Sequence, residues 1–63
     1  MNKNEIIEAR IKRFEEQLKV WQRMERMARE EGDEESVNNS LMLQNYYGGI
    51  IKGMKEVVDI MNI

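Results

Sequence analysis

The stretch Glu30-Glu31-Gly32-Asp33-Glu34-Glu35-Ser36 (EEGDEES) divides the 63-residue chain into two halves of nearly equal length. Gly32 suits the position just after a helix, because a glycine adopts positive φ without a clash from a Cβ atom. Asp33 suits the N-cap of a following helix, and the two glutamates after it complement the positive end of the helix dipole. The stretch therefore predicts a tight connection between two helices, about 3–31 and 34–61, that are antiparallel neighbours.

Apolar residues on both sides of this turn recur at intervals of three and four, which is typical of a helix with one buried face. In the first half, this stripe consists of Ile7, Ile11, Phe14, Leu18, Trp21, Met24 and Ala28. In the second half, it consists of Val37, Leu41, Tyr47, Ile51, Met54, Val58 and Met61. Either Asn2 or Asn4 is the expected N-cap of the first helix.

The spacing also predicts how the two stripes face each other. Facing residues of an antiparallel hairpin have sequence numbers with a constant sum, and six apolar pairs here share the sum 65. Trp21 and Gln44 form the one mixed pair, in which the indole is expected to lie across the amide or to donate its N–H to it. The sequence thus predicts an all-α, antiparallel two-helix hairpin with residues 1–63 as a single domain. The six pairs are Ile7–Val58, Ile11–Met54, Phe14–Ile51, Leu18–Tyr47, Met24–Leu41 and Ala28–Val37.

The second half carries a further apolar stripe, about a quarter turn around the helix from the first. One partner helix covers one stripe only, and a chain this short buries little surface alone. We therefore expect homo-oligomerisation into a four-helix bundle, as a homodimer or a tetramer. The first half adds a smaller apolar flank of Ile6, Val20, Met24 and Met27. The expected oligomer interface consists of Leu43, Tyr46, Ile50, Gly53, Val57 and Ile60.

Three glycines interrupt this segment in the stretch NYYGGIIKG, residues 45–53. A glycine within a helix costs about 0.8–1 kcal/mol relative to alanine, so their presence calls for a reason. Gly49 and Gly53 lie beside the second stripe and suit close approach of another helix, or room for an aromatic ring of a neighbour. Gly48 faces the polar side, and packing does not explain it. The alternative is a small-ligand site between chains, with contacts from Tyr46, Tyr47, Gly48 and Lys52, where tyrosines stack a nucleotide base.

Composition excludes several classes of function. The chain has no cysteine and no histidine, which removes disulfides, the usual zinc sites and nucleophilic or general-base catalysis built on these residues. The acidic turn lacks the alternating ligand pattern of a calcium loop, and capping explains it better. We therefore expect a non-enzyme with no catalytic residue, no metal and no cofactor.

Charge and hydropathy limit the classes of partner that the sequence allows. Charged residues make up 35% of the chain with a net charge of −2, which disfavours nucleic-acid binding. Cations of the first helix pair with glutamates four residues before them, as in Glu8–Lys12, Glu15–Lys19 and Glu25–Arg29, and form a solvated face. No apolar run is long enough to span a membrane, and the first residues lack a signal-peptide core. We expect a cytoplasmic location.

The C-terminal third resembles small helical-hairpin proteins of low-GC Gram-positive bacteria and their phages. The similar features are the entry formed by Tyr46, Tyr47 and Gly49, and the run Ile50, Met54, Val58. Most such proteins have no assigned activity, and the resemblance implies an inhibitor or sponge that binds a host protein or a nucleotide signal. We therefore expect a non-enzymatic, homo-oligomeric interaction protein, such as a phage or prophage accessory factor that binds a host protein. The alternative function is binding or sequestering of a nucleotide-type ligand near Tyr46–Gly49.

Overall fold

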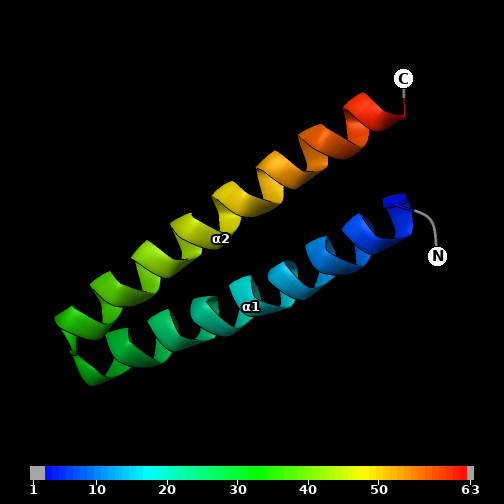
Figure 1. Ribbon diagram of the computed structural model, residues 1–63. Helices are drawn as coiled ribbons and strands as arrows, with labels where there is room; N and C mark the ends of the chain where they lie inside the picture. Colours follow the sequence, from blue (N-terminus) through cyan, green and yellow to red (C-terminus); the bar gives the residue numbers. More distant parts are fainter. Residues whose placement is uncertain (1–2, 63) are drawn as a thin grey trace.

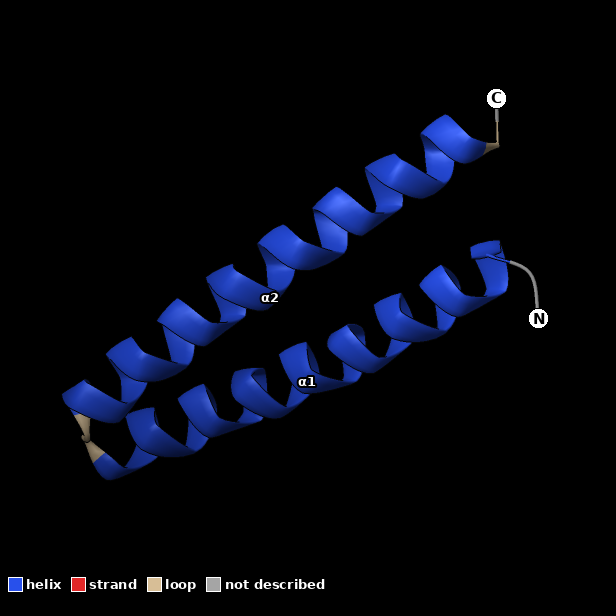
Figure 2. Ribbon diagram, viewed as in Figure 1, coloured by secondary structure: helices blue, strands red, loops and turns tan. Residues whose placement is uncertain are grey.

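The computed structural model describes residues 3–62, which form one hairpin of two helices. Helix α1 spans Lys3–Glu31 and helix α2 spans Glu34–Met61. The helices run antiparallel, so the start of α1 lies beside the end of α2 (Figure 1). A two-residue loop joins them (Figure 2). These bounds confirm the predicted hairpin. Asn4 lies inside α1 and is not its N-cap, and the alternative cap, Asn2, lies outside the described residues.

The two-residue loop provides hydrogen-bond partners both for the last backbone carbonyls of α1 and for the first backbone N–H groups of α2. Gly32 has φ 71°, and its N–H donates to the carbonyl of Arg29 at 3.2 Å. The N–H of Asp33 donates to the carbonyl of Ala28 at 2.9 Å, which completes a Schellman motif. The Asp33 carboxylate then accepts hydrogen bonds from the backbone N–H of Ser36 at 3.1 Å and from its hydroxyl at 2.6 Å. Asp33 is therefore the N-cap of α2, as predicted.

The seam between the helices follows the predicted register. Seven pairs with the sum 65 span its length, and all fourteen residues are buried or half-buried. Ile11, Ala28, Ser40 and Ile51 are the most buried of them. Along α2 the seam is a regular alternation of three- and four-residue steps, occupied by Val37, Ser40, Gln44, Tyr47, Ile51, Met54 and Val58.

The structure corrects one of the predicted pairs. Met24 and Leu41 are 45% and 36% exposed, and the seam places Glu25 and Ser40 at the corresponding level. Ser40 is only 2% exposed. The prediction followed polarity, whereas the angular position on the helix determines which side chain enters the seam. Met61, which was also assigned to the core stripe, is exposed.

Gln44 links the two helices through hydrogen bonds that the prediction placed differently. Its side-chain amide Nε2 donates to the Glu25 carboxylate at 2.7 Å and to the backbone carbonyl of Trp21 at 3.4 Å. The amide is thus the donor, and the indole N–H is not its partner. Further along the seam, the ring of Phe14 lies 5.9 Å from that of Tyr47, centroid to centroid.

We expect Gly32→Ala to destabilise the hairpin by about 1–2 kcal/mol, the cost of a left-handed backbone in a residue with a Cβ atom. Among the described residues, none apart from Gly32 and its two chain neighbours has an atom within 4 Å of the position that this Cβ would occupy, so the cost is that of the backbone alone. Thermal and urea unfolding followed by circular dichroism measures it. Gly32→Asn is the matched control and should cost clearly less, because asparagine tolerates this conformation better. Equal stability of Gly32→Ala and the unchanged chain would contradict the role given to Gly32.

Candidate functional site

The second apolar stripe of α2 is open to solvent in the single hairpin. Leu43 and Ile50 are half-buried, whereas Tyr46 and Ile60 are 61% and 70% exposed, and Val57 is also exposed. Gly53 completes the stripe and is exposed as well. We call these six residues, together with Met24 and Met27 of α1, the apolar face. The hairpin itself therefore leaves four of the six predicted interface residues exposed and two half-buried.

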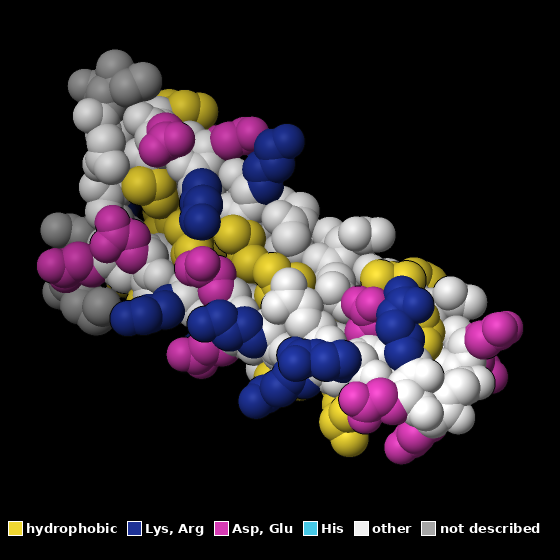
Figure 3. All heavy atoms as spheres, turned by 180° about the vertical axis from the view of Figure 1, so that it is seen from behind, with side chains coloured by type: hydrophobic (Ala, Val, Ile, Leu, Met, Phe, Trp, Pro, Cys, Tyr) yellow, Lys and Arg dark blue, Asp and Glu magenta, His cyan; other side chains and the backbone are white. Residues whose placement is uncertain are grey.

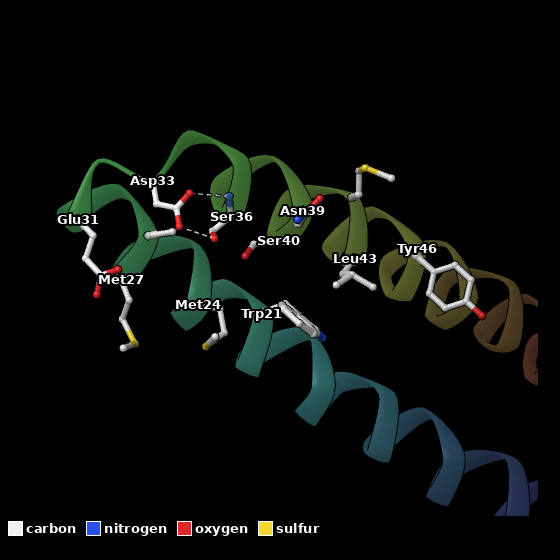
Figure 4. A pocket seen from close by; sticks show the side chains of 12 residues that line it. Trp21, Met24, Met27, Glu31, Asp33, Ser36, Asn39, Ser40, Leu43 and Tyr46 are labelled. Carbon is white, nitrogen blue, oxygen red and sulfur yellow. Dashed lines mark hydrogen bonds between the residues drawn. The ribbon is translucent and has the colours of Figure 1, made fainter.

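A hollow of about 680 Å³ opens on this face near the turn. Trp21 of α1 points toward Leu43 of α2, and Met24 and Met27 lie along α1 beside it (Figure 4). Tyr46 forms the edge farther from the turn. The charged residues that line the hollow are both acidic, Glu31 and Asp33, and lie at its turn end. Ser36, Asn39 and Ser40 also line the hollow, which is thus a mainly apolar groove with a polar and acidic margin.

A second hollow, of about 520 Å³, continues the same face toward the open end of the hairpin. Its lining residues are Ile7, Gly49, Ile50, Gly53, Met54 and Val57. None of the described residues that line it carries a charge. The apolar face therefore carries two grooves along its length, one near the turn and one beyond it.

The shape of the molecule accounts for this exposure. The chain measures 47 × 18 × 10 Å, and its radius of gyration of 14.6 Å exceeds the about 10.6 Å of a compact chain of this length. Its accessible surface is 5130 Å², whereas a compact globular protein of 7.5 kDa exposes about 4,250 Å². The excess is about 900 Å², similar to the about 800 Å² that each partner buries in a stable protein–protein interface.

Packing inside the hairpin does not account for the helical glycines. A Cβ atom built on Gly48, Gly49 or Gly53 has no atom within 4 Å apart from the local helix backbone. Alanine would fit all three positions of the single chain and would favour the helix. The close approach predicted at Gly49 and Gly53 is therefore not made by α1.

The structure does not bring the four predicted ligand residues into one hollow. Tyr46 lines the groove near the turn, whereas Gly48 and Lys52 line a hollow with Glu15 and Leu18. Gly48 follows Tyr46 by two positions, about 200° around the helix, and so faces the other side. Tyr47 lies in the seam against Phe14, and its ring is 5.3 Å from that of Tyr46 in an edge-to-face arrangement.

The opposite side of the hairpin is charged. In the view of Figure 3, lysine and arginine side chains alternate with acidic ones along the length, and apolar side chains line the furrow between the helices. Two hollows on this side are lined by residues such as Glu8, Lys12, Lys55 and Asp59. Among residues 3–62, Glu25–Arg29 is the one predicted pair within ion-pair distance, at 2.7 Å.

Two carboxyl groups differ from ordinary surface carboxylates. The hydrogen bond from Gln44, with the hydrogen bond and charge of Arg29, lowers the pKa of Glu25 below its usual value. The hydrogen bonds from the hydroxyl and backbone N–H of Ser36 lower the pKa of Asp33 in the same direction. Both shifts favour the charged form, as expected for structural contacts of a seam and a cap.

Sequence reasoning missed two residues of this region. Ser40 lies in the seam and also lines the groove near the turn, and Met42 is exposed at the margin of that groove. The unbroken alternation of three- and four-residue steps through Val37, Ser40 and Gln44 could have identified Ser40. Met42 precedes Leu43 and was outside both apolar stripes, because only their strict spacing was followed.

Comparison with known proteins gives no matching family model, no matching curated protein and no matching solved structure. The resemblance to small hairpin proteins of Gram-positive bacteria and phages therefore stays a prediction. Over the described residues, neither helix contains an apolar segment long enough to cross a lipid bilayer.

We expect acid to weaken the contact between Gln44 and Glu25. Because the pKa of Glu25 is lowered in the folded chain, its contribution to stability is complete above about pH 4.3, the ordinary value for glutamate, and is lost as the pH falls through the folded value. Gln44→Met removes the donor, so its melting temperature should fall less between pH 5 and pH 3 than that of the unchanged chain.

Circular dichroism melts at fixed protein concentration measure this difference, and an NMR titration should give a higher Glu25 pKa in Gln44→Met. Ser36→Ala is the control for the titration, because it removes a hydrogen bond of Asp33 and should leave the pKa of Glu25 unchanged. If Gln44→Met and the unchanged chain lose stability equally with acid, the contact between the Gln44 amide and the Glu25 carboxylate has no energetic role.

Proposed function

We propose that this protein is a non-enzymatic, self-associating interaction protein in which two hairpins pack through their apolar faces into a four-helix bundle. The observation that carries the proposal is the exposed stripe of α2, which continues across both grooves. A second copy is the simplest partner, because one symmetric contact covers the same apolar face on both chains.

The exposed area supports assembly of this size. The hairpin exposes about 900 Å² more than a compact chain of its mass, which matches one side of a standard interface. Burial of a large apolar side chain contributes about 1.5–3 kcal/mol, and each stripe residue is buried twice in a symmetric dimer. A few such residues therefore suffice for a stable pair of hairpins.

The role of the assembled bundle is to bind another protein, and the charged side of the hairpin is the surface that assembly leaves accessible. Lysine, arginine and acidic residues alternate there (Figure 3), so binding to a partner with complementary charges is favoured over binding to a polyanion. The resemblance noted above makes a host protein the expected partner.

Binding of a nucleotide-type ligand is the second candidate, supported by the volume of the groove near the turn and by its aromatic residues Trp21 and Tyr46. The charges oppose it, however, because Glu31 and Asp33 line this groove and would repel a phosphate. Lys52 lines the other side of the hairpin and gives no compensation in this groove. We therefore rank self-association first.

We expect Val57→Asp to shift the protein from oligomer to monomer, with a loss of at least about 100-fold in association constant. The estimate takes about 1.5 kcal/mol for each of two buried valines per dimer and tenfold per 1.4 kcal/mol. Sedimentation equilibrium measures the association constant. Trp21, the single tryptophan, lies in the groove and should show blue-shifted emission only in the oligomer.

Asn45→Asp is the matched control, since it adds the same charge to an exposed position of α2 outside the apolar face. It should assemble like the unchanged chain. A hairpin that stays monomeric at high micromolar concentration, before any substitution, would refute the proposal.

For the second candidate, we expect a panel of nucleotides and cyclic dinucleotides to leave the melting temperature of the oligomer unchanged. Differential scanning fluorimetry at millimolar ligand concentration measures this. A rise in melting temperature that Tyr46→Ala abolishes and Tyr47→Phe retains would instead identify the groove near the turn as a ligand site.

A further inference from the structure

From the placement of the exposed stripe, we infer that two copies of α2 pack antiparallel across a two-fold axis between Ile50 and Gly53, so that facing residues have numbers with the sum 103. This inference rests on the proposed self-association and specifies its geometry. The partner is a second copy of this chain, as the exposed area indicates.

The stripe is self-complementary in this register. Leu43 faces Ile60 of the second copy, Tyr46 faces its Val57, and Ile50 faces its Gly53. Each pair joins a residue in one half of the stripe to one in the other half, as two-fold symmetry requires. All six positions therefore have a partner, and none is left over.

This arrangement explains why positions 49 and 53 are glycines. Gly53 has open space where a Cβ atom would lie, and it faces Ile50 of the second copy, which is half-buried in the single hairpin. Gly49 is also open, lies on the same side of α2, and is less than one helical turn from the axis. A glycine leaves room for a side chain of a neighbouring helix, so that the two helices can approach closely. Helix α1 does not occupy this room.

Both grooves of the face are then covered by α2 of the second copy, the one near the turn by its C-terminal end and the one around Gly53 by its middle. The groove near the turn, bounded by Trp21 and Tyr46, receives Val57 and Ile60 of the second copy. Ile60 is among the most exposed apolar side chains of the described chain. Because the contact is symmetric, the first copy fills the corresponding groove of the second.

A parallel arrangement of α2 fits less well. It would place Gly53 against Gly53 and leave a void, while Tyr46 would meet Tyr46. It would also set Glu35 beside Glu35 and Glu56 beside Glu56, which are repulsive pairs. In the antiparallel register, Glu56 lies near Met42 and Gly49 of the second copy, and Glu35 falls beyond the overlap.

Cysteine cross-linking tests the register, because the natural chain contains no cysteine. Tyr46→Cys and Val57→Cys each place one thiol at an exposed position. Under mild oxidation, a mixture of the two variants should yield the mixed covalent dimer, and each variant alone should yield at least about tenfold less dimer. Efficient cross-linking of each variant with itself would overturn the antiparallel register.

The outcomes separate this inference from the proposed function. If sedimentation shows a dimer but the mixture does not cross-link, the register is wrong and self-association stands. If the chain sediments as a monomer and no combination cross-links, both are wrong.

Two glycine substitutions give an independent readout. Gly53→Ala should weaken the association constant at least about tenfold, because the added methyl group enters the space of Ile50 of the second copy. Gly48→Ala, on the other side of α2, is the matched control and should associate like the unchanged chain. Both should raise the helix stability of the diluted monomer, since a Cβ atom fits both sites. Equal association of the two variants would overturn the close contact at Gly53.

Discussion

The structure depends on a mismatch between the two helices: α2 carries two apolar stripes about a quarter turn apart, and α1 covers only one of them. Two helices side by side form a layer one helix thick, here 10 Å in its shortest dimension. Such a layer has a seam but no interior, so even its best-packed side chains stay close to solvent. Ile11 and Ile51 are 7% exposed, and few other apolar residues are as well covered. The second stripe, the open grooves and the unused space at the glycines all follow from this geometry.

The seam itself combines apolar packing with a polar segment near the turn. Gln44 bridges the carboxylate of Glu25 and the backbone of Trp21, and the small side chain of Ser40 lies beside them in the seam. A shift of α2 by one helical turn would separate Gln44 from Glu25 and leave the partly buried amide without these acceptors. A partly buried amide without an acceptor costs free energy, whereas apolar side chains can contact different apolar neighbours after a shift. The polar segment therefore adds a penalty for a shifted register to the preference that the apolar spacing already sets.

The two sides of the hairpin have different chemistry, which bears on function. The groove near the turn is lined mainly by apolar side chains, with acidic and neutral polar residues beside them, and the second groove is lined by apolar side chains and glycines. The other side alternates positive and negative charges (Figure 3). A surface of the first kind is typical of an interface that excludes water, and one of the second kind stays hydrated. The two carboxyl groups with lowered pKa values belong to Glu25 in the seam and Asp33 in the turn. Their pKa values are lowered by hydrogen bonds within the hairpin.

The sequence by itself determined the turn, the bounds of both helices and the register, because Gly32 and Asp33 act locally and the apolar spacing has one period throughout. It also identified the stripe that the hairpin leaves open. Only the tertiary structure showed that Met24 and Leu41 remain exposed, and that Glu25 is half-buried with its carboxylate bound by Gln44. The physical reason is that exposure depends on the angle of a side chain relative to the neighbouring helix and on the local distance between helices. Sequence patterns use residue polarity, which measures neither this angle nor this distance directly.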